Sequence, residues 1–165
     1  MRSLRIAISL GLLAIATVAL AQTSAQKSFD QLKTLTGSWE GKSSLSGKIL
    51  RVTFEDTADG YALMSKMEKS HHGPMISMFH MDGPNRLMFA HYCFDGTQSR
   101  LTASPSPDGK TITFDFLDAT NLATPDAGHY QRIVFTMLDA NHHTEGWTFN
   151  DHGKDMEEFY DLQRK

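Results

Sequence analysis

The sequence has a single cysteine, Cys93, no cluster of lysine or arginine, and only one long apolar run. A single cysteine cannot form an internal disulfide, so the fold has to be held together by its core. The lack of a basic patch speaks against a nucleic-acid partner. No segment beyond residue 21 is apolar enough to span a bilayer, so we expect no stable membrane insertion.

The one apolar run, from Ile6 to Ala21, has the pattern of a secretion signal. Arg2 and Arg5 precede it, and it ends in the small-x-small pattern that signal peptidase reads. We therefore expect residues 1–21 to be a signal peptide cleaved after Ala21, and the protein to be periplasmic or secreted. Of the 165 residues, removal of these 21 leaves 144, which suits one domain. That part has 14 basic and 19 acidic residues, a net charge of −5.

The remaining chain begins with a short helical pattern and continues as a series of strands. Residues 22–27 are polar and are expected to be flexible, and Ser28 can cap a helix that Gly37 ends. From Trp39 onward, short apolar or alternating segments are separated by Gly, Pro, Asp and Asn, the residues typical of turns. Ten segments qualify as strands: 39–45, 49–55, 61–68, 75–81, 86–94, 100–104, 111–117, 130–138, 144–150 and 157–163.

This pattern predicts an all-β protein, with residues 28–165 forming one antiparallel up-and-down β-barrel of about ten strands behind a short N-terminal helix. No helix is long enough for a βαβ crossover, and closing the sheet into a barrel removes its edges. A ten-stranded barrel is wider than its own side chains readily fill, which favours a ligand cavity. The long connection from Asp118 to His129 is expected to lie at a barrel mouth.

A helix followed by Gly37-x-Trp39-x-Gly41 and some ten strands resembles the calycin-type barrels: lipocalins, fatty-acid-binding proteins and the haem-binding nitrobindins. The sequence is more similar to exported bacterial proteins of an uncharacterised family with lipocalin-like barrels. That resemblance covers most of the mature chain and rests on its short motifs, for example Met78-Phe79-His80-Met81-Asp82-Gly83, His91-Tyr92-Cys93 and Glu145-Gly146-Trp147-Thr148.

The resemblance implies a structural role for Trp39, which would close one barrel end beneath a basic residue from near the end of the chain. Arg132, Arg164 and Lys165 are the candidates for that partner. Two features depart from these families. The nitrobindin glycine series would continue at position 43, which is serine here, and the lipocalin disulfide has no counterpart.

The hairpin from Met75 to Phe94 is the strongest candidate for a chemical site. A turn over residues 82–85 would pair even positions of its first strand with odd positions of its second. His80, His91 and Cys93 would then share one face with Met78, a set that suits a soft metal such as copper. The competing interpretation is core or cavity lining, because Met and lone Cys usually fill apolar space. Both faces are apolar, so the sequence does not decide which one points inward.

Further candidates lie outside this hairpin. His129 and Asn121 belong to the predicted mouth loop, and Arg100 would need a carboxylate if it pointed into the barrel. His142 and His143 sit at a turn and are expected to be exposed. The full set of predicted ligand-binding residues is Met78, His80, His91, Tyr92, Arg100, Asn121, His129 and Trp147.

No motif of a nucleophile elbow, phosphate loop, zinc protease or dithiol oxidoreductase is present. The leading hypothesis is therefore a binding protein for a small hydrophobic or amphipathic ligand, with no cofactor. The alternatives are copper or haem binding through His80, His91 and Cys93, and an enzyme that uses a histidine at the barrel mouth.

Overall fold

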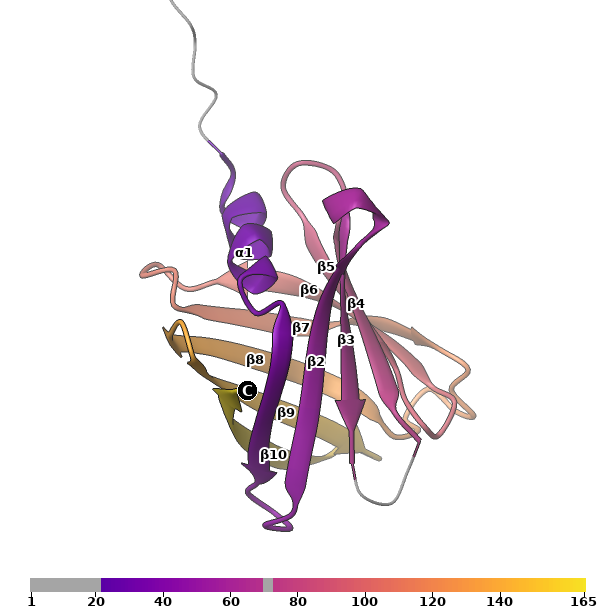
Figure 1. The fold of residues 1–165 in the computed structure, drawn as a ribbon. Helices are drawn as coiled ribbons and strands as arrows, with labels where there is room; N and C mark the ends of the chain where they lie inside the picture. Colours follow the sequence, from indigo (N-terminus) through magenta and orange to yellow (C-terminus); the bar gives the residue numbers. More distant parts are fainter. Residues whose placement is uncertain (1–21, 70–72) are drawn as a thin grey trace, which may run out of the picture.

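The structure is a computed structural model that describes residues 22–69 and 73–165. Ten strands form a closed antiparallel barrel in which each strand pairs with the next and β1 pairs with β10 (Figure 1). The predicted fold class is thus confirmed; the predicted signal peptide lies outside the described residues. No described helix is both long and apolar enough to cross a bilayer. The strands are β1 (Gly37–Ser43), β2 (Ile49–Thr57), β3 (Ala62–Glu68), β4 (Met75–Met81), β5 (Leu87–Tyr92), β6 (Gln98–Pro105), β7 (Thr111–Thr120), β8 (His129–Asp139), β9 (His142–Asp151) and β10 (Lys154–Arg164).

The helix α1 (Ser24–Lys33) begins five residues earlier than the predicted cap at Ser28 implies. Thr23 is its N-cap, because its hydroxyl accepts a hydrogen bond from the Gln26 amide at 3.2 Å. Ser28 therefore lies inside the helix, where it is buried. The Thr23 hydroxyl also donates to the Pro84 carbonyl at 2.6 Å, which ties the start of the helix to the β4–β5 loop.

The helix closes one end of the barrel, seen at the top of Figure 1. Its apolar face is buried through Phe29 and Leu32, and Leu35 follows in the same cluster. Trp39 lies beneath it, donating its indole N–H to the Leu35 carbonyl at 2.6 Å. The Arg164 guanidinium stacks 4.3 Å from the Trp39 ring and donates to the carbonyls of Thr34 and Thr36. Of the three predicted basic partners, Arg164 is the one that packs on Trp39.

The two glycines that flank Trp39 are required by this end of the barrel. Gly37 has a φ of +128°, and a β-carbon there would lie 2.9 Å from the Arg164 guanidinium. At Gly41 a β-carbon would collide with the carbonyl of Asp161 on β10. The Gly-x-Trp-x-Gly stretch is thus the seam at which the first and last strands meet.

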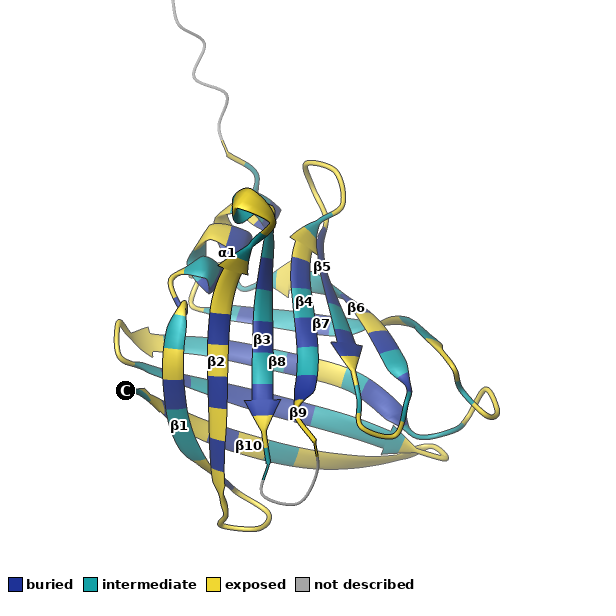
Figure 2. Ribbon diagram, turned by 45° about the vertical axis from the view of Figure 1, so that its right-hand side comes forward, coloured by how far each residue is buried: buried dark blue, intermediate teal, exposed yellow. Residues whose placement is uncertain are grey.

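Buried and exposed residues alternate along the strands, as the dark and light bands of Figure 2 show. Inward-facing aromatic rings, among them Phe54, Phe79, Phe89, Phe114 and Phe135, fill the half of the barrel next to α1. These rings contact one another in tilted and edge-to-face arrangements and are almost completely buried. Space remains at the opposite end, where the β1–β2, β3–β4, β5–β6, β7–β8 and β9–β10 connections lie.

Candidate ligand-binding site

A cavity of about 320 Å³ opens at the end of the barrel opposite α1. Its volume is at the lower end of the roughly 300–1,000 Å³ that is typical of ligand pockets. Residues from three strands, β8, β9 and β10, and from three connections, β1–β2, β3–β4 and β5–β6, meet there, so the ring of the barrel itself positions the site. The lining consists of Leu45, Lys69, Cys93, Phe94, Asp95, Tyr130, Trp147, Phe149, Met156 and Glu158.

One wall of the cavity is aromatic. The Tyr130 ring packs edge-on against Trp147 at 5.1 Å and against Phe149 at 5.2 Å between centroids. Tyr130 and Trp147 are both almost completely buried, and burial raises the pKa of the Tyr130 hydroxyl, which therefore stays protonated. These rings form a rigid apolar surface of the kind that holds a flat or hydrocarbon ligand.

A buried polar network behind the wall fixes Trp147. His143, Glu145 and Trp147 alternate along β9 and therefore all point into the barrel. The Trp147 indole N–H donates to Glu145 at 2.9 Å, and His143 Nε2 lies 3.2 Å from the other carboxylate oxygen. A buried carboxylate is costly without such donors, so the network holds both partners in one arrangement. The Trp147 ring is thereby held in one orientation at the cavity.

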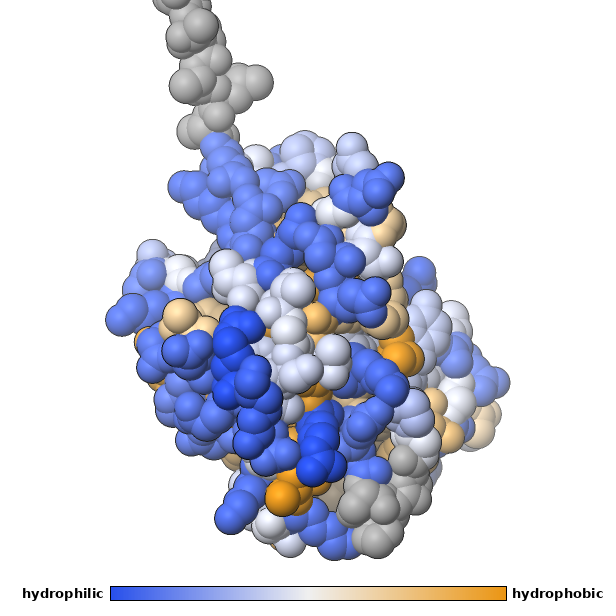
Figure 3. All heavy atoms as spheres, in the orientation of Figure 1, coloured by the Kyte–Doolittle hydropathy of each residue, from blue (hydrophilic) through white to orange (hydrophobic). Residues whose placement is uncertain are grey.

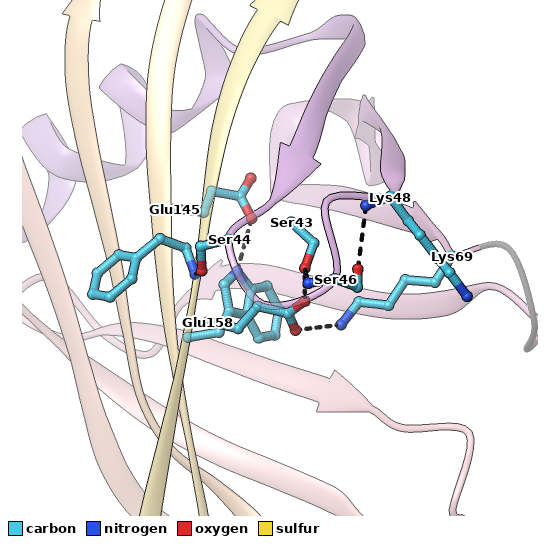
Figure 4. Close-up of polar contacts among 9 residues, drawn as sticks. Ser43, Ser44, Ser46, Lys48, Lys69, Glu145 and Glu158 are labelled. Atoms are coloured by element: carbon cyan, nitrogen blue, oxygen red, sulfur yellow. Dashed lines mark hydrogen bonds and ion pairs between the residues drawn. The ribbon is translucent and has the colours of Figure 1, made fainter.

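The opposite wall carries a polar cluster (Figure 4). The Lys69 ammonium is 2.8 Å from one Glu158 oxygen, and the Ser43 hydroxyl donates to the other at 2.5 Å. Lys69 also lies 5.2 Å from the centroid of the Tyr160 ring. Burial alone would raise the pKa of Glu158, but the hydrogen bonds from Lys69 and Ser43 outweigh it and hold that pKa below its ordinary value. Glu158 is therefore ionised at neutral pH.

The rim of the cavity is apolar. Leu45 in the β1–β2 loop, Phe94 in the β5–β6 turn and Met156 at the start of β10 all expose about half or more of their surface. Figure 3 shows hydrophobic surface at the lower end of the molecule, beside the β1–β2 loop, on a face that is otherwise largely hydrophilic. Exposed apolar residues that border a cavity are a common feature of ligand-binding grooves.

His91 lies inside the barrel, directly behind the aromatic wall. Its ring packs against Tyr130 at 4.8 Å and Trp147 at 5.0 Å, and its Nδ1 is 2.9 Å from the Ser77 hydroxyl. Nε2 has no partner among the described residues. Burial, together with the nearby charge of Lys69, lowers the pKa of His91 to about 3, so the ring is neutral.

The predicted grouping of His80 with His91 is wrong, because the hairpin loop is one residue shorter than expected. Asp82 and Arg86 still pair, the Asp82 amide donating to the Arg86 carbonyl at 2.8 Å, which leaves a loop of residues 83–85. Odd positions of β4 therefore face odd positions of β5, and Ser77 rather than His80 shares the inner face with His91. His80 is exposed on the outer face.

The metal site predicted from His80, His91 and Cys93 accordingly does not come together. Within residues 22–69 and 73–165, no group of three or more His, Cys, Asp or Glu side chains is placed to hold a metal ion. Cys93 does line the cavity, and burial raises the pKa of its thiol, so the sulfur is protonated at neutral pH. The residues proposed for copper or haem thus do not fit a shared ligand set.

Three other predicted binding residues lie on the outer surface. Arg100 is exposed and forms a two-pronged ion pair with Asp118 on the neighbouring strand. Met78 and Tyr92 also belong to the outer face, because the β4–β5 register places odd positions inside. None of these three side chains lines the cavity.

The predicted mouth loop lies beside the cavity rather than over it. Asn121 donates to the Gly96 carbonyl at 2.8 Å, and Gly128 packs against the Phe149 ring, where a β-carbon would come within 2.6 Å. His129 is buried between local partners: its Nδ1 is 2.7 Å from the Ala127 carbonyl and its Nε2 is 3.1 Å from the Gln131 side chain. Asn121 and His129 therefore support the cavity wall from outside.

Trp147 is the predicted binding residue that lines the cavity itself, with His91 directly behind it. Sequence reasoning missed the Lys69–Glu158–Ser43 cluster, and it wrongly placed His143 at an exposed turn. The buried network could have been predicted from spacing: His143, Glu145 and Trp147 are two residues apart, so in a strand all three face the same side. Ser43, the departure from the glycine series, turns out to hold Glu158.

These features define a helix-capped, ten-stranded antiparallel β-barrel with a part-aromatic, part-polar cavity at its open end. No family model matches the sequence, and no curated protein resembles it significantly. Among solved structures, the crystal structure of Rv2717c from M. tuberculosis is similar, with a TM-score of 0.59 and 14% sequence identity. The match covers 84% of this chain and 97% of that one. At this identity the likeness shows the fold alone.

Proposed function

We propose that the protein is an exported, lipocalin-like binding protein that holds one small hydrophobic or amphipathic molecule in the open end of its barrel. The observation that carries the proposal is the 320 Å³ cavity between the aromatic wall and the Lys69–Glu158 cluster. An apolar wall with a few convergent polar groups is the usual construction of a small-molecule site. The exposed rim residues Leu45, Phe94 and Met156 would cover the outer part of the ligand.

Export is proposed from the sequence of residues 1–21, with its basic start, apolar run and small residues before the expected cleavage point. Sequencing the N-terminus of protein from the extracellular or periplasmic fraction tests it. A mature chain that starts at Gln22 supports export, whereas a chain retained with Met1 in the cell contradicts it.

Native mass spectrometry of the protein purified from its own host tests ligand binding directly. We expect an extra organic mass that is released on denaturation. Purified protein should also bind N-phenyl-1-naphthylamine, a small uncharged probe, with quenching of Trp147 fluorescence. The Trp39→Phe variant isolates the Trp147 signal, and Trp147→Phe is the matched control in which that quenching is lost. A protein that carries no organic mass and does not bind the probe would contradict the proposal.

A further inference from the structure

The charged groups that line the cavity affect which ligands it can accommodate. Among the described residues, two carboxylates, Asp95 and Glu158, line the cavity together with one ammonium group, Lys69. The Lys69 ammonium forms an ion pair with Glu158 at 2.8 Å and is therefore not available to an anionic ligand. The pair is partly shielded, with side-chain exposures of 27% for Lys69 and 20% for Glu158. Shielding of this kind strengthens a charge interaction relative to water.

An anionic head group that approached Lys69 would either separate it from Glu158 or become a second negative charge beside that carboxylate. The first route takes the Lys69 donor away from Glu158, a carboxylate in a partly buried place whose other oxygen accepts from the Ser43 hydroxyl. The second meets direct repulsion, to which Asp95 adds. An uncharged polar group escapes both penalties and can still accept a hydrogen bond from Lys69, which has donors to spare.

We propose that the cavity prefers uncharged amphiphiles to anionic ones, and that Glu158 is the specificity-determining residue, because its pairing with Lys69 excludes anions. This inference rests on the proposed function and names the ligand class of the same site. Removing the charge of Glu158 would release Lys69 for an anion. Lys69 would stay in position, because the Tyr160 ring lies beneath its ammonium.

Two probes with the same ring system test the inference: uncharged N-phenyl-1-naphthylamine and its sulfonated analogue, 8-anilino-1-naphthalenesulfonate. We expect the full mature chain to bind the uncharged probe at least about tenfold more tightly than the sulfonate. Glu158→Gln keeps the side-chain size and the acceptor for Ser43. It should improve sulfonate binding about tenfold, so that the preference for the uncharged probe over the sulfonate is lost.

Two further variants assign the effect to the Lys69–Glu158 pair. In the double variant Lys69→Gln/Glu158→Gln, the gain in sulfonate binding should disappear, because the ammonium that would receive the anion is gone. Asp95→Asn is the matched control: it removes the other carboxylate of the lining, which is exposed to solvent and bonded to Thr97. It should change sulfonate binding by less than about threefold. Lys69→Gln alone should weaken sulfonate binding further, an independent test if Glu158→Gln does not fold.

Equal binding of the two probes by the wild-type chain would overturn the inference and leave the proposed function standing. So would a Glu158→Gln variant that folds but keeps the wild-type preference, or a gain that survives in the double variant. If the folded wild-type chain binds neither probe, the cavity is not a binding site, and the proposed function fails together with the inference.

Discussion

At the α1 end of the barrel, Trp39 is enclosed by Leu35 and Arg164, and its indole N–H is bonded inside the protein. At the other end, Trp147 is bonded just as firmly to Glu145, but its ring borders a cavity and an apolar rim. Both tryptophans are fixed and almost fully buried. The difference lies in what covers them: the first has a helix, and the second has space. Two similarly anchored tryptophans thus border a closed end of the barrel in one case and a cavity in the other.

The closed end should carry most of the stability. Trp39→Ala removes a fully buried ring together with its hydrogen bond to Leu35. We expect it to lower the free energy of unfolding by about 3–5 kcal/mol, measured by urea denaturation. The fraction that remains folded should bind N-phenyl-1-naphthylamine within about twofold of wild type, because the site is at the opposite end. A loss below about 1 kcal/mol would contradict a structural role for this tryptophan.

The neutral His91 behind the site should make stability depend on pH. Its pKa in the folded protein is about 3 against 6.5 for a free side chain, so between these values the unfolded chain binds a proton that the folded chain does not. Stability contributed by neutral His91 is therefore complete above pH 6.5 and falls on acidification, by at most about 1.4 kcal/mol per pH unit.

His91→Gln removes this titration while keeping a polar partner for Ser77. The difference between the wild-type and variant stability curves, measured by urea denaturation from pH 7 to pH 4, should shrink as the pH falls. If the two curves of unfolding free energy against pH are parallel across that range, protonation of His91 does not destabilise the folded protein, and the prediction is contradicted. The variant is also expected to be less stable at pH 7, because it loses the ring contacts to Tyr130 and Trp147.

The rim should matter for binding and little for stability. Met156 and Leu117 are both 47% exposed, but only Met156 lines the cavity. Met156→Ala should weaken binding of the uncharged probe several-fold while changing the free energy of unfolding by no more than about 0.5 kcal/mol. Leu117→Ala is the matched control and should leave binding unchanged. Equal effects of the two variants in a fluorescence titration would remove the rim from the site.

Arg100 is expected to give the smallest effect. Its ion pair with Asp118 is exposed on the outer face, and such pairs contribute about 0–1 kcal/mol. Arg100→Met should therefore leave probe binding at the wild-type value and shift thermal unfolding only slightly. A clear loss of binding would mean that the outer face of β6 contributes to the site.

The sequence predicted the barrel well because its strongest signals are local. Turn residues separated the ten strands, and Gly37, Trp39 and Gly41 indicated where the barrel begins; in the structure this stretch lies where β1 meets β10. The sequence did not predict which residues of the Met75–Phe94 hairpin share a face, because a loop one residue shorter reverses the pairing of odd and even positions. In the structure Asp82 pairs with Arg86 and does not belong to the turn. The Lys69–Glu158 pair joins residues 89 positions apart. Only the closure of the barrel brings those two side chains together.

The pairing of β1 with β10 also constrains the order of folding. Strands β2 to β9 can be added one hairpin at a time, since each pairs with its neighbour in sequence. The ring is sealed only when β10 reaches β1, a contact between opposite ends of the domain that carries the largest loop-closure entropy. Until then β1 and the last strand formed are both open edges, to which another chain can add. The pairing of β10 with β1 brings Glu158 beside Ser43 and Lys69. The same pairing covers the two open strand edges to which another chain could add.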